Sequence, residues 1–224
     1  MQINNERLEK KWIFENNTMK FDNILISLIR SKFNFKQHYE NRFINSIYFD
    51  NKNLSCVKDN LDGEKNRRKY RLRWYGSSKV IQNPYFEIKS KSGLTSNKNR
   101  IKINLKNNIK FNDHNVAKLS DIINKKIVLN KFLVPKILIS YERTYLISSD
   151  NLIRATLDKN IKFKKLNFNS LGFFSNLKKI ILEIKYTTDL DKHVRSLLNE
   201  IPVRYSKSSK YIQCMLMNSR EFVE

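Results

Sequence analysis

Basic residues recur at every second position in several short segments of this 224-residue chain. Side chains of a β-strand alternate between its two faces, so residues two apart point the same way. In seven such segments one face is apolar, and the other carries these residues: Arg7, Glu9 and Lys11; Arg71 and Arg73; Glu87, Lys89 and Lys91; Lys98, Arg100 and Lys102; Tyr141, Arg143 and Tyr145; Arg154, Thr156 and Asp158; Glu183 and Lys185. Arg offers phosphate oxygens a planar fork and Lys a mobile point charge. The pattern therefore predicts binding of a dense polyanion.

Two arrangements of a sheet account for such a charged face. In the first it is the solvent face of a half-exposed sheet. In the second it lines a water-filled tunnel, and the apolar face packs outward against helices. Repetition in seven strands favours the second, because solvent faces normally mix Thr, Ser, Gln and both charge signs. A lumen with so many cations would repel itself if empty, which predicts an anionic occupant.

The carboxylates among these cations are too few to act as their counterions. They are Glu9, Glu87, Asp158 and Glu183. We interpret them instead as ligands of a divalent metal, because Mg²⁺ and Mn²⁺ take carboxylate and phosphate oxygens together. Other metal and nucleotide motifs are missing from the sequence: Cys56 and Cys214 lie far apart, and neither Walker-A nor dinucleotide glycine patterns occur.

The charge is large for a chain that can still build a core. The sequence has 44 Lys+Arg and 21 Asp+Glu, a net charge of +23, yet 40% of its residues are hydrophobic. This composition excludes a disordered basic tail. Part of the lysine excess reflects an A+T-rich genome, but that background predicts scattered lysines. No signal-peptide core or membrane-length apolar run occurs, so we expect no membrane span and a cytoplasmic, reducing location.

Four amphipathic helices and about eight strands must position these residues. The helices are expected over Asp22–Phe35, Asp113–Asn130, Asp189–Glu200 and Ser208–Phe222. The strands are expected over Glu9–Phe14, Phe43–Phe49, Arg68–Tyr75, Tyr85–Lys91, Asn99–Leu105, Lys136–Ser148, Ile153–Phe163 and Ile180–Tyr186. No repeat or linker interrupts them. The sequence predicts one domain over residues 1–224, of α+β class, with an antiparallel sheet or closed β-tunnel and flanking helices.

Nine fragments in fixed order resemble the VTC domain. This domain is the catalytic module of the vacuolar transporter chaperone polyphosphate polymerases, and it has the triphosphate tunnel metalloenzyme (CYTH-like) fold. The fragments are RLEKKW (7–12), NSIYFDN (45–51), RKYRLRWYG (68–76), FEIKSK (86–91), KNRIKI (98–103), YERTYL (141–146), RATLD (154–158), LEIKY (182–186) and KSSKYI (207–212). The resemblance implies a β-tunnel that transfers the γ-phosphoryl group of ATP to a growing inorganic polyphosphate chain, with Mn²⁺ or Mg²⁺.

The resemblance also implies roles for residues. By motif match, phosphate binding falls to Lys11, Arg71, Arg73, Lys89, Lys98, Arg143, Arg154, Lys207 and Lys210, and metal binding to Glu183. Of these, catalysis is assigned to Lys11, Arg71, Arg73, Lys89 and Lys210. The strand alternation adds Arg7, Lys91, Arg100, Tyr141 and Lys185 to the phosphate-binding set, and Glu9, Glu87 and Asp158 to the metal set.

Two departures from the family pattern leave alternatives open. Lys91 stands where some family members carry His. The CYTH phosphohydrolases open with Glu-x-Glu-x-Lys, whereas this chain has Arg7, Glu9 and Lys11, which weakens a hydrolase that activates water. The alternatives are a metal-dependent tripolyphosphate or nucleoside triphosphate hydrolase of the same fold, and a non-catalytic binder of polyphosphate or nucleic acid. Aromatic residues mostly alternate opposite the charges, so nucleic acid is not the expected partner; a membrane or complex partner is left open.

Overall fold

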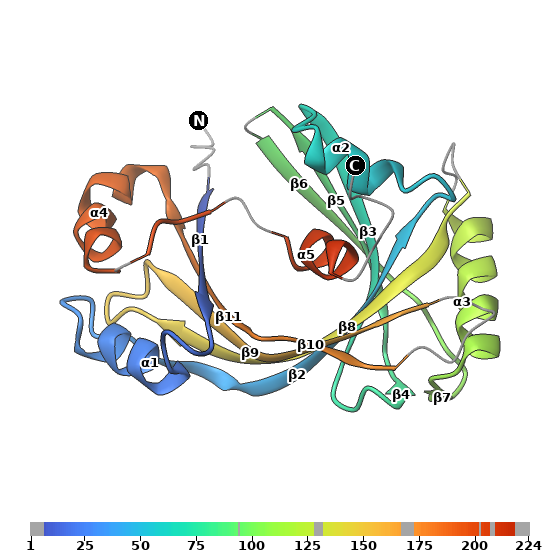
Figure 1. The fold of residues 1–224 in the computed structure, drawn as a ribbon, viewed down its shortest axis with the longest axis horizontal. Coiled ribbons are helices and arrows are strands. Elements are labelled where there is room, and N and C mark those ends of the chain that lie inside the picture. Colours follow the sequence, from blue (N-terminus) through green and yellow to red (C-terminus); the bar gives the residue numbers. More distant parts are fainter. Residues whose placement is uncertain are drawn as a thin grey trace. The chain divides into compact units, whose positions relative to one another are not determined.

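The computed structural model describes residues 7–93, 95–127, 132–166, 173–201, 203–206 and 209–217, without the side chains of 196–200. Its strands are β1 (Arg7–Glu15), β2 (Lys36–Asp50), β3 (Asn66–Tyr75), β4 (Val80–Ile81), β5 (Tyr85–Ser92), β6 (Thr95–Lys102), β7 (Ile109–Lys110), β8 (Val134–Ile147), β9 (Arg154–Lys165), β10 (Ser175–Leu177) and β11 (Lys179–Thr187). Its helices are α1 (Phe21–Arg30), α2 (Ser55–Leu61), α3 (Asp113–Lys126), the 3-10 turn η1 (Thr188–Leu190), α4 (Asp191–Glu200) and α5 (Lys210–Leu216) (Figure 1).

Eight long strands form one sheet in the order β1-β11-β9-β8-β2-β3-β5-β6. The short strand β10 pairs with β9, and β4 pairs with β7 in a separate ribbon. The registers of β1 with β11, β11 with β9, β2 with β3, β3 with β5 and β5 with β6 are antiparallel. The predicted α+β class, with an antiparallel sheet of about eight strands, is therefore confirmed.

Two compact units divide the chain, and their segments interleave in sequence. Unit 1 comprises Met1–Arg42, Tyr141–Ile161 and Leu177–Ser208; unit 2 comprises Phe43–Ser140, Lys162–Asn176 and Ser209–Glu224. Because β2, β8 and β9 each contribute residues to both units, no linker marks the division. The single domain expected over residues 1–224 stays a prediction.

Unit 1 has its own apolar core. The apolar faces of β1, β9 and β11 pack against α1 and α4 (Figure 1), in a cluster that includes Trp12, Phe14, Leu157, Leu182, Ile184 and Tyr186 from the strands and Ile24, Leu28 and Val194 from the helices. The helices therefore cover the face opposite Glu9, Lys11, Glu183 and Lys185.

Unit 2 repeats this arrangement with different elements. The apolar faces of β2, β3 and β5 pack with α2 and α3, in a cluster that includes Ile47, Phe49, Tyr70, Leu72, Trp74 and Phe86 from the strands and Cys56, Val116, Leu119 and Ile123 from the helices. Within each unit, helices pack on the apolar side, as the second of the two sheet arrangements requires.

Helix boundaries differ from the predicted ones for local reasons. Helix α1 ends at Arg30, because Ser31 is extended and Asn34 has a positive φ of 44°. Phe33 and Phe35 are still buried, so the apolar pattern continues past the helix. The short helix α2 was not predicted. The expected helix ends at Asn130 and at Phe222 lie outside the described residues.

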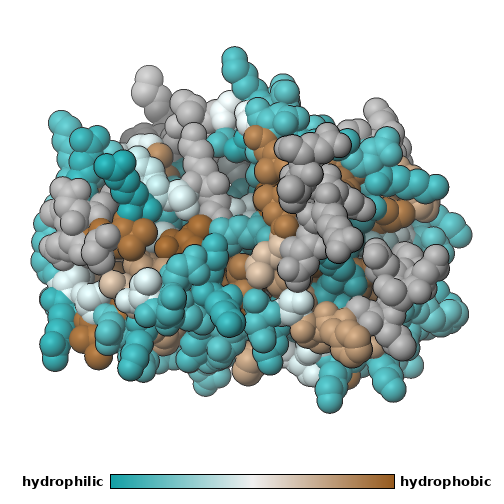
Figure 2. Space-filling view, viewed as in Figure 1, coloured by the Kyte–Doolittle hydropathy of each residue, from teal (hydrophilic) through white to brown (hydrophobic). Residues whose placement is uncertain are grey.

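Hydrophilic residues cover much of the face seen in Figure 2, and hydrophobic residues lie there in separate groups. None of the helices in the described part of the chain is long and apolar enough to cross a membrane.

Candidate functional site

The register of β3, β5 and β6 gathers the predicted basic residues of unit 2 on one face. Arg71 lies opposite Glu87, and Glu87 lies opposite Arg100. Residues directly opposite each other share a face, as do residues two apart. We call this set the unit 2 cationic face; its basic members are Arg67, Lys69, Arg71, Arg73, Lys89, Lys91, Lys98, Arg100 and Lys102. In the described residues of these three strands, Glu87 is the one carboxylate that shares the face.

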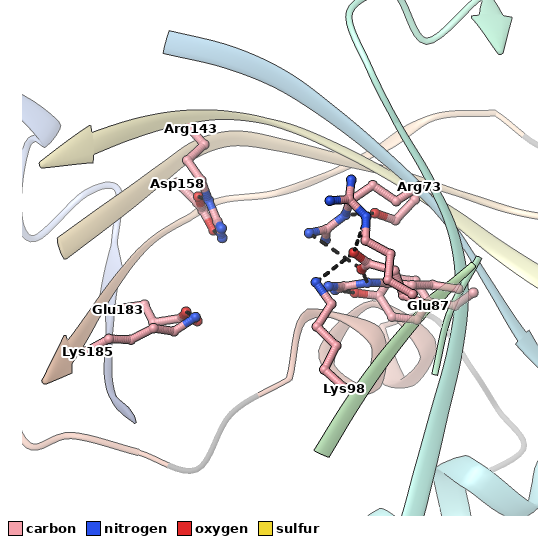
Figure 3. A network of polar contacts seen from close by, with 11 residues as sticks. Arg73, Glu87, Lys98, Arg143, Asp158, Glu183 and Lys185 are labelled. Carbon is pink, nitrogen blue, oxygen red and sulfur yellow. Dashed lines mark hydrogen bonds and ion pairs between the residues drawn. The ribbon is translucent and has the colours of Figure 1, made fainter. Parts of the chain in front are cut away.

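Glu87 lies in the middle of this face and is 2% exposed. Arg71 Nε donates to Glu87 Oε2 at 2.7 Å, and Lys98 Nζ lies 2.6 Å from Glu87 Oε1. The guanidinium groups of Arg73 and Arg100 lie at 4.0 and 3.7 Å from the same carboxylate. Figure 3 shows the side chains of Arg73 and Lys98 converging on Glu87. One buried anion therefore holds cations from β3 and β6 in a fixed group.

The electrostatics of this group are dominated by its cations. Burial alone would raise the pKa of Glu87, but the charges of Arg71 and Arg73 and the bond from Lys98 lower it to about 2. The pKa of Lys98 is also lowered, by burial and by repulsion from Arg71 and Arg73, although Glu87 opposes this. Burial and the neighbouring arginines thus both disfavour the charged form of Lys98, and a bound anion would favour it.

Strand β2 adds hydroxyl groups to the same face. Arg73 Nε donates to Ser46 Oγ at 3.1 Å, and Arg71 Nη1 donates to Tyr48 Oη at 3.2 Å. These bonds fix both guanidinium groups. Neither Ser46 nor Tyr48 was among the predicted site residues, although their alternation within NSIYFDN placed them beside the basic strands.

Helix α5 reaches this face through Tyr211. Its ring stacks on Tyr48, with centroids 4.9 Å apart and planes at 4°. Tyr211 Oη donates to Asp50 Oδ2 at 3.0 Å, and Asp50 also accepts the backbone N–H groups of Cys56 and Val57 at the start of α2. Asp50 is therefore a cap and anchor residue. Lys210 is the first residue of α5 and directly precedes Tyr211, whereas Lys207 lies outside the described residues.

In unit 1, Arg143 and Asp158 form a bidentate ion pair. Arg143 Nε and Nη2 donate to the two carboxylate oxygens at 2.6 and 2.8 Å. Asp158 is 1% exposed. Burial alone would lower the pKa of Arg143, but the charge of Asp158 raises it. Tyr141, another predicted phosphate ligand, is buried, and its ring centre lies 5.4 Å from the Arg143 guanidinium.

The second group in unit 1 joins β1 to β11. Lys11 Nζ lies 2.5 Å from Glu9 and 3.3 Å from Glu183, while Lys185 Nζ lies 3.6 and 2.7 Å from the same two carboxylates. Figure 3 shows the tips of Glu183 and Lys185 together. Two carboxylates thus share two ammonium groups.

This balance of charge shifts the pKa of a lysine in the opposite direction from the one in unit 2, whereas the carboxylate pKa is lowered in both. Burial alone would lower the pKa of Lys11, but Glu183 and Glu9 raise it. Burial would raise the pKa of Glu183, but Lys11, Lys185 and Arg143 hold it well below its usual range. Lys11 and Glu183 are therefore both charged at neutral pH.

The carboxylates form ion pairs with the cations around them, although they remain outnumbered in unit 2. Each one lies within ion-pair distance of at least one basic side chain: Glu9, Glu87, Asp158 and Glu183. Total charges in the sequence did not show which groups would become neighbours. In the sheet, each carboxylate contacts the cations of the adjacent strands, so a few anions serve several neighbours.

Two of these carboxylates fit a divalent metal best. Lys11 Nζ lies between Glu9 and Glu183, so this pair can hold a cation. Thr156, opposite Glu183 in the register, has a buried Oγ1 without a hydrogen-bond partner. Mg²⁺ and Mn²⁺ need only one or two carboxylates when phosphates supply other ligands. Glu87 and Asp158 fit less well, because arginines already bind them. Among the described residues, no group of three His, Cys, Asp or Glu could hold a metal.

The structure places the remaining predicted residues less centrally. In unit 1, Arg154 lies opposite Lys185 and is exposed, and Arg7 is exposed at the start of β1. In unit 2, Lys89 is exposed and Lys91 is half-buried on the cationic face. Two further members of that face were not predicted: Arg67 lies just before the expected strand, which began at Arg68, and Lys69 lies within it but was not counted among its charged residues. Lys102 was recognised in the alternation but given no role.

Comparison with known proteins agrees with this geometry. A protein named as a candidate adenylate cyclase from Bacillus halodurans has a similar fold, with a TM-score of 0.53, 13% identity, and coverage of 94% of this chain and 97% of that one. A second such protein, from Vibrio parahaemolyticus, has a TM-score of 0.50, 14% identity, and coverage of 93% and 97%. No curated protein matches the sequence. The VTC domain profile matches residues 5–218, so the chain belongs to the VTC domain family.

Proposed function

We propose that this protein is a polyphosphate polymerase that transfers the γ-phosphoryl group of ATP to the end of an inorganic polyphosphate chain. The observation that carries the proposal is the unit 2 cationic face in a chain of the VTC domain family. Nine basic side chains around one carboxylate suit a ligand with a negative charge on every repeating unit. A ligand with one or two charges would use only a few of them.

The proposed reaction places few demands on acid–base chemistry. A terminal phosphate oxygen of the chain attacks the γ-phosphorus, the bond from γ-phosphorus to the bridging oxygen breaks, and ADP leaves with the electron pair. The attacking phosphate is ionised near neutral pH, so no general base is needed. Catalysis then consists of positioning and neutralising charge. Arg71 and Arg73, fixed by Glu87, Tyr48 and Ser46, are suited to orient phosphate groups.

A divalent cation would be held in unit 1 by Glu9 and Glu183. When bound, Mg²⁺ or Mn²⁺ neutralises charge on phosphate oxygens. Lys11 and Lys185 lie at the same carboxylates and can themselves contact phosphate. Asp158 binds Nε and Nη2 of Arg143, which leaves three of the guanidinium's five N–H groups to contact an anion.

The test is incubation of the purified protein with ATP and Mn²⁺, with products separated on a gel. Long phosphate chains together with ADP are expected. Free phosphate without chains would instead assign the protein to the hydrolases of this fold, and no turnover with retained polyphosphate binding would assign it to the non-catalytic binders.

A matched pair of variants links the activity to the cationic face. Arg100→Ala removes a cation 3.7 Å from Glu87, whereas Arg68→Ala removes an exposed arginine on the opposite face of β3. We expect Arg100→Ala to weaken polyphosphate binding by about tenfold and to lower its salt dependence, since fewer counterions are displaced. Arg68→Ala should change binding less than about twofold. Equal losses in both variants would contradict a localised binding face.

A further inference from the structure

A group of aromatic rings and a guanidinium lies at the junction of β2 and β8 in unit 1. The rings of Tyr39 and Tyr145 meet edge to face, with centroids 5.8 Å apart and planes at 84°. The Arg42 guanidinium lies 5.6 Å from the centre of the Tyr39 ring and 5.9 Å from that of Tyr145. The His38 ring, 3.9 Å from the Tyr39 ring, supports it from the neighbouring position. The rings of this aromatic group are thus held in place by one another, and Arg42 gives the group a positive charge.

Tyr39 is available to a ligand. Its side chain is 50% exposed, and it is not a member of the unit 1 core. Aromatic rings and planar guanidinium groups are the surfaces on which nucleobases stack, because every base has a π-face. An inorganic phosphate chain has no π-face, so it cannot stack on these rings.

The aromatic group adjoins a phosphate-binding candidate. The Arg143 guanidinium lies 6.0 Å from the centre of the Tyr145 ring, and residues 143 and 145 share a face of β8. Asp158 fixes Arg143 through its bidentate pair. A ligand with a base at one end and phosphates at the other would contact the Tyr39 group and Arg143 together.

We propose that Tyr39, Arg42 and Tyr145 form a stacking platform for the nucleobase of a nucleoside triphosphate. This inference rests on the proposed function, because it assigns part of the donor nucleotide to a site in unit 1. Stacking needs no hydrogen bonds to the base edge. The platform therefore accepts different bases and separates nucleotides from inorganic phosphate chains.

The test compares binding of a non-hydrolysable ATP analogue with binding of inorganic tripolyphosphate, both by calorimetry on the full chain. Tyr39→Ala is expected to lower the affinity for the ATP analogue by about tenfold, the usual loss for one stacked base. The affinity for tripolyphosphate should change by less than about twofold. Tyr39→Trp should retain or improve binding of the analogue. Because Tyr39 is exposed and outside the core, all variants should melt near the wild-type temperature.

Tyr205→Ala is the matched control. Tyr205 is also exposed in unit 1, meets Trp12 edge to face, and has Lys10 Nζ 4.3 Å from its ring centre. Lys10 and Trp12 belong to the opposite face of β1 from Lys11, so this variant should bind both ligands normally. Unchanged ATP-analogue binding in Tyr39→Ala, or equal losses for both ligands, would overturn the platform. Binding can be measured without turnover. If Tyr39→Ala lowered only the affinity for the ATP analogue, but the protein made no phosphate chains, the stacking platform would stand and the proposed polymerase activity would be rejected.

Discussion

A lysine contacts a carboxylate at similar distance in each unit, with opposite consequences. Lys98 of unit 2 lies 2.6 Å from Glu87, and Lys11 of unit 1 lies 2.5 Å from Glu9. The pKa of Lys98 is lowered, whereas that of Lys11 is raised. The difference comes from the neighbours, because Lys98 shares Glu87 with three arginines, whereas Lys11 has a second carboxylate, Glu183. The effect of an ion pair on the pKa of its lysine therefore depends on all the charged groups around the pair.

This contrast suggests a division of labour. The unit 2 cationic face has a large excess of cations around one anion, so it should supply most of the attraction for a polyanion. In unit 1, Glu9, Asp158 and Glu183 balance most of the cations. A nearly balanced group attracts a polyanion less, but it can hold a metal and orient a reacting phosphate. We expect substitutions of the unit 1 carboxylates Glu9 and Glu183 to affect turnover, and those in the unit 2 cationic face to affect polyphosphate binding.

Glu183→Gln should have the largest effect. Loss of this charge removes a proposed metal ligand and leaves Lys11 and Lys185 with Glu9 alone. Chain synthesis should fall roughly 100-fold, while polyphosphate affinity changes less than about threefold. Gel assay and calorimetry on the same preparation measure both. Glu142→Gln is the control, since Glu142 pairs with Lys159 instead. If binding and synthesis fell together, the division between the units would be wrong.

Glu87→Gln should have the next largest effect, on stability. It leaves Arg71, Arg73 and Lys98 without their shared anion, at a cost of about 2 to 3 kcal/mol in the free energy of unfolding. Because the pKa of Glu87 is lowered to about 2, its ionised form stabilises the fold above its ordinary pKa of 4.5. That contribution is lost as pH falls from 4.5 toward 2.

Urea unfolding at pH 7, 4 and 3 measures this effect. The variant should be less stable at pH 7 and should lose less stability than the wild type on acidification. The exposed Glu64→Gln provides a control in the same unit. A variant as pH-sensitive as the wild type would refute the central role of Glu87 in unit 2.

The smallest effect is expected in amine labelling, which compares the pKa of Lys98 with that of Lys11 most directly. Only the neutral amine reacts, so labelling of Lys98 should reach its half-maximal rate at a lower pH than that of Lys11. Exposure also changes rates, so the midpoint, not the rate, is compared by peptide mass spectrometry. Added polyphosphate should protect Lys98. A Lys98 midpoint at or above that of Lys11 would remove the contrast between the units.

Strand alternation predicted much of the site because it is a local property. Arg71, Glu87 and Lys98 could be placed on charged faces without knowing which strands pair. Their convergence required the register of β3, β5 and β6. Helix periodicity predicted the end of α1 less exactly. Phe33 and Phe35 are buried although they follow the helix, and in the sequence they cannot be distinguished from buried residues within it.

Asp50 illustrates what a local pattern leaves open. Its sequence context allowed a turn, a cap or a ligand, and the choice depended on Tyr211, 161 residues away. The aromatic group of Tyr39 and Tyr145 likewise joins residues that are far apart in the sequence but lie on neighbouring strands of the sheet.

The sequence by itself determined the excess of positive charge, its alternation along the strands and the family to which the chain belongs. These follow from residue types and short spacings, which no folding can alter. Only the tertiary structure decided which cations share a carboxylate, and therefore whether a lysine such as Lys98 or Lys11 has its charge opposed or reinforced. Coulomb interactions depend on distance and on the surrounding medium, and both are set when distant strands pair and become buried.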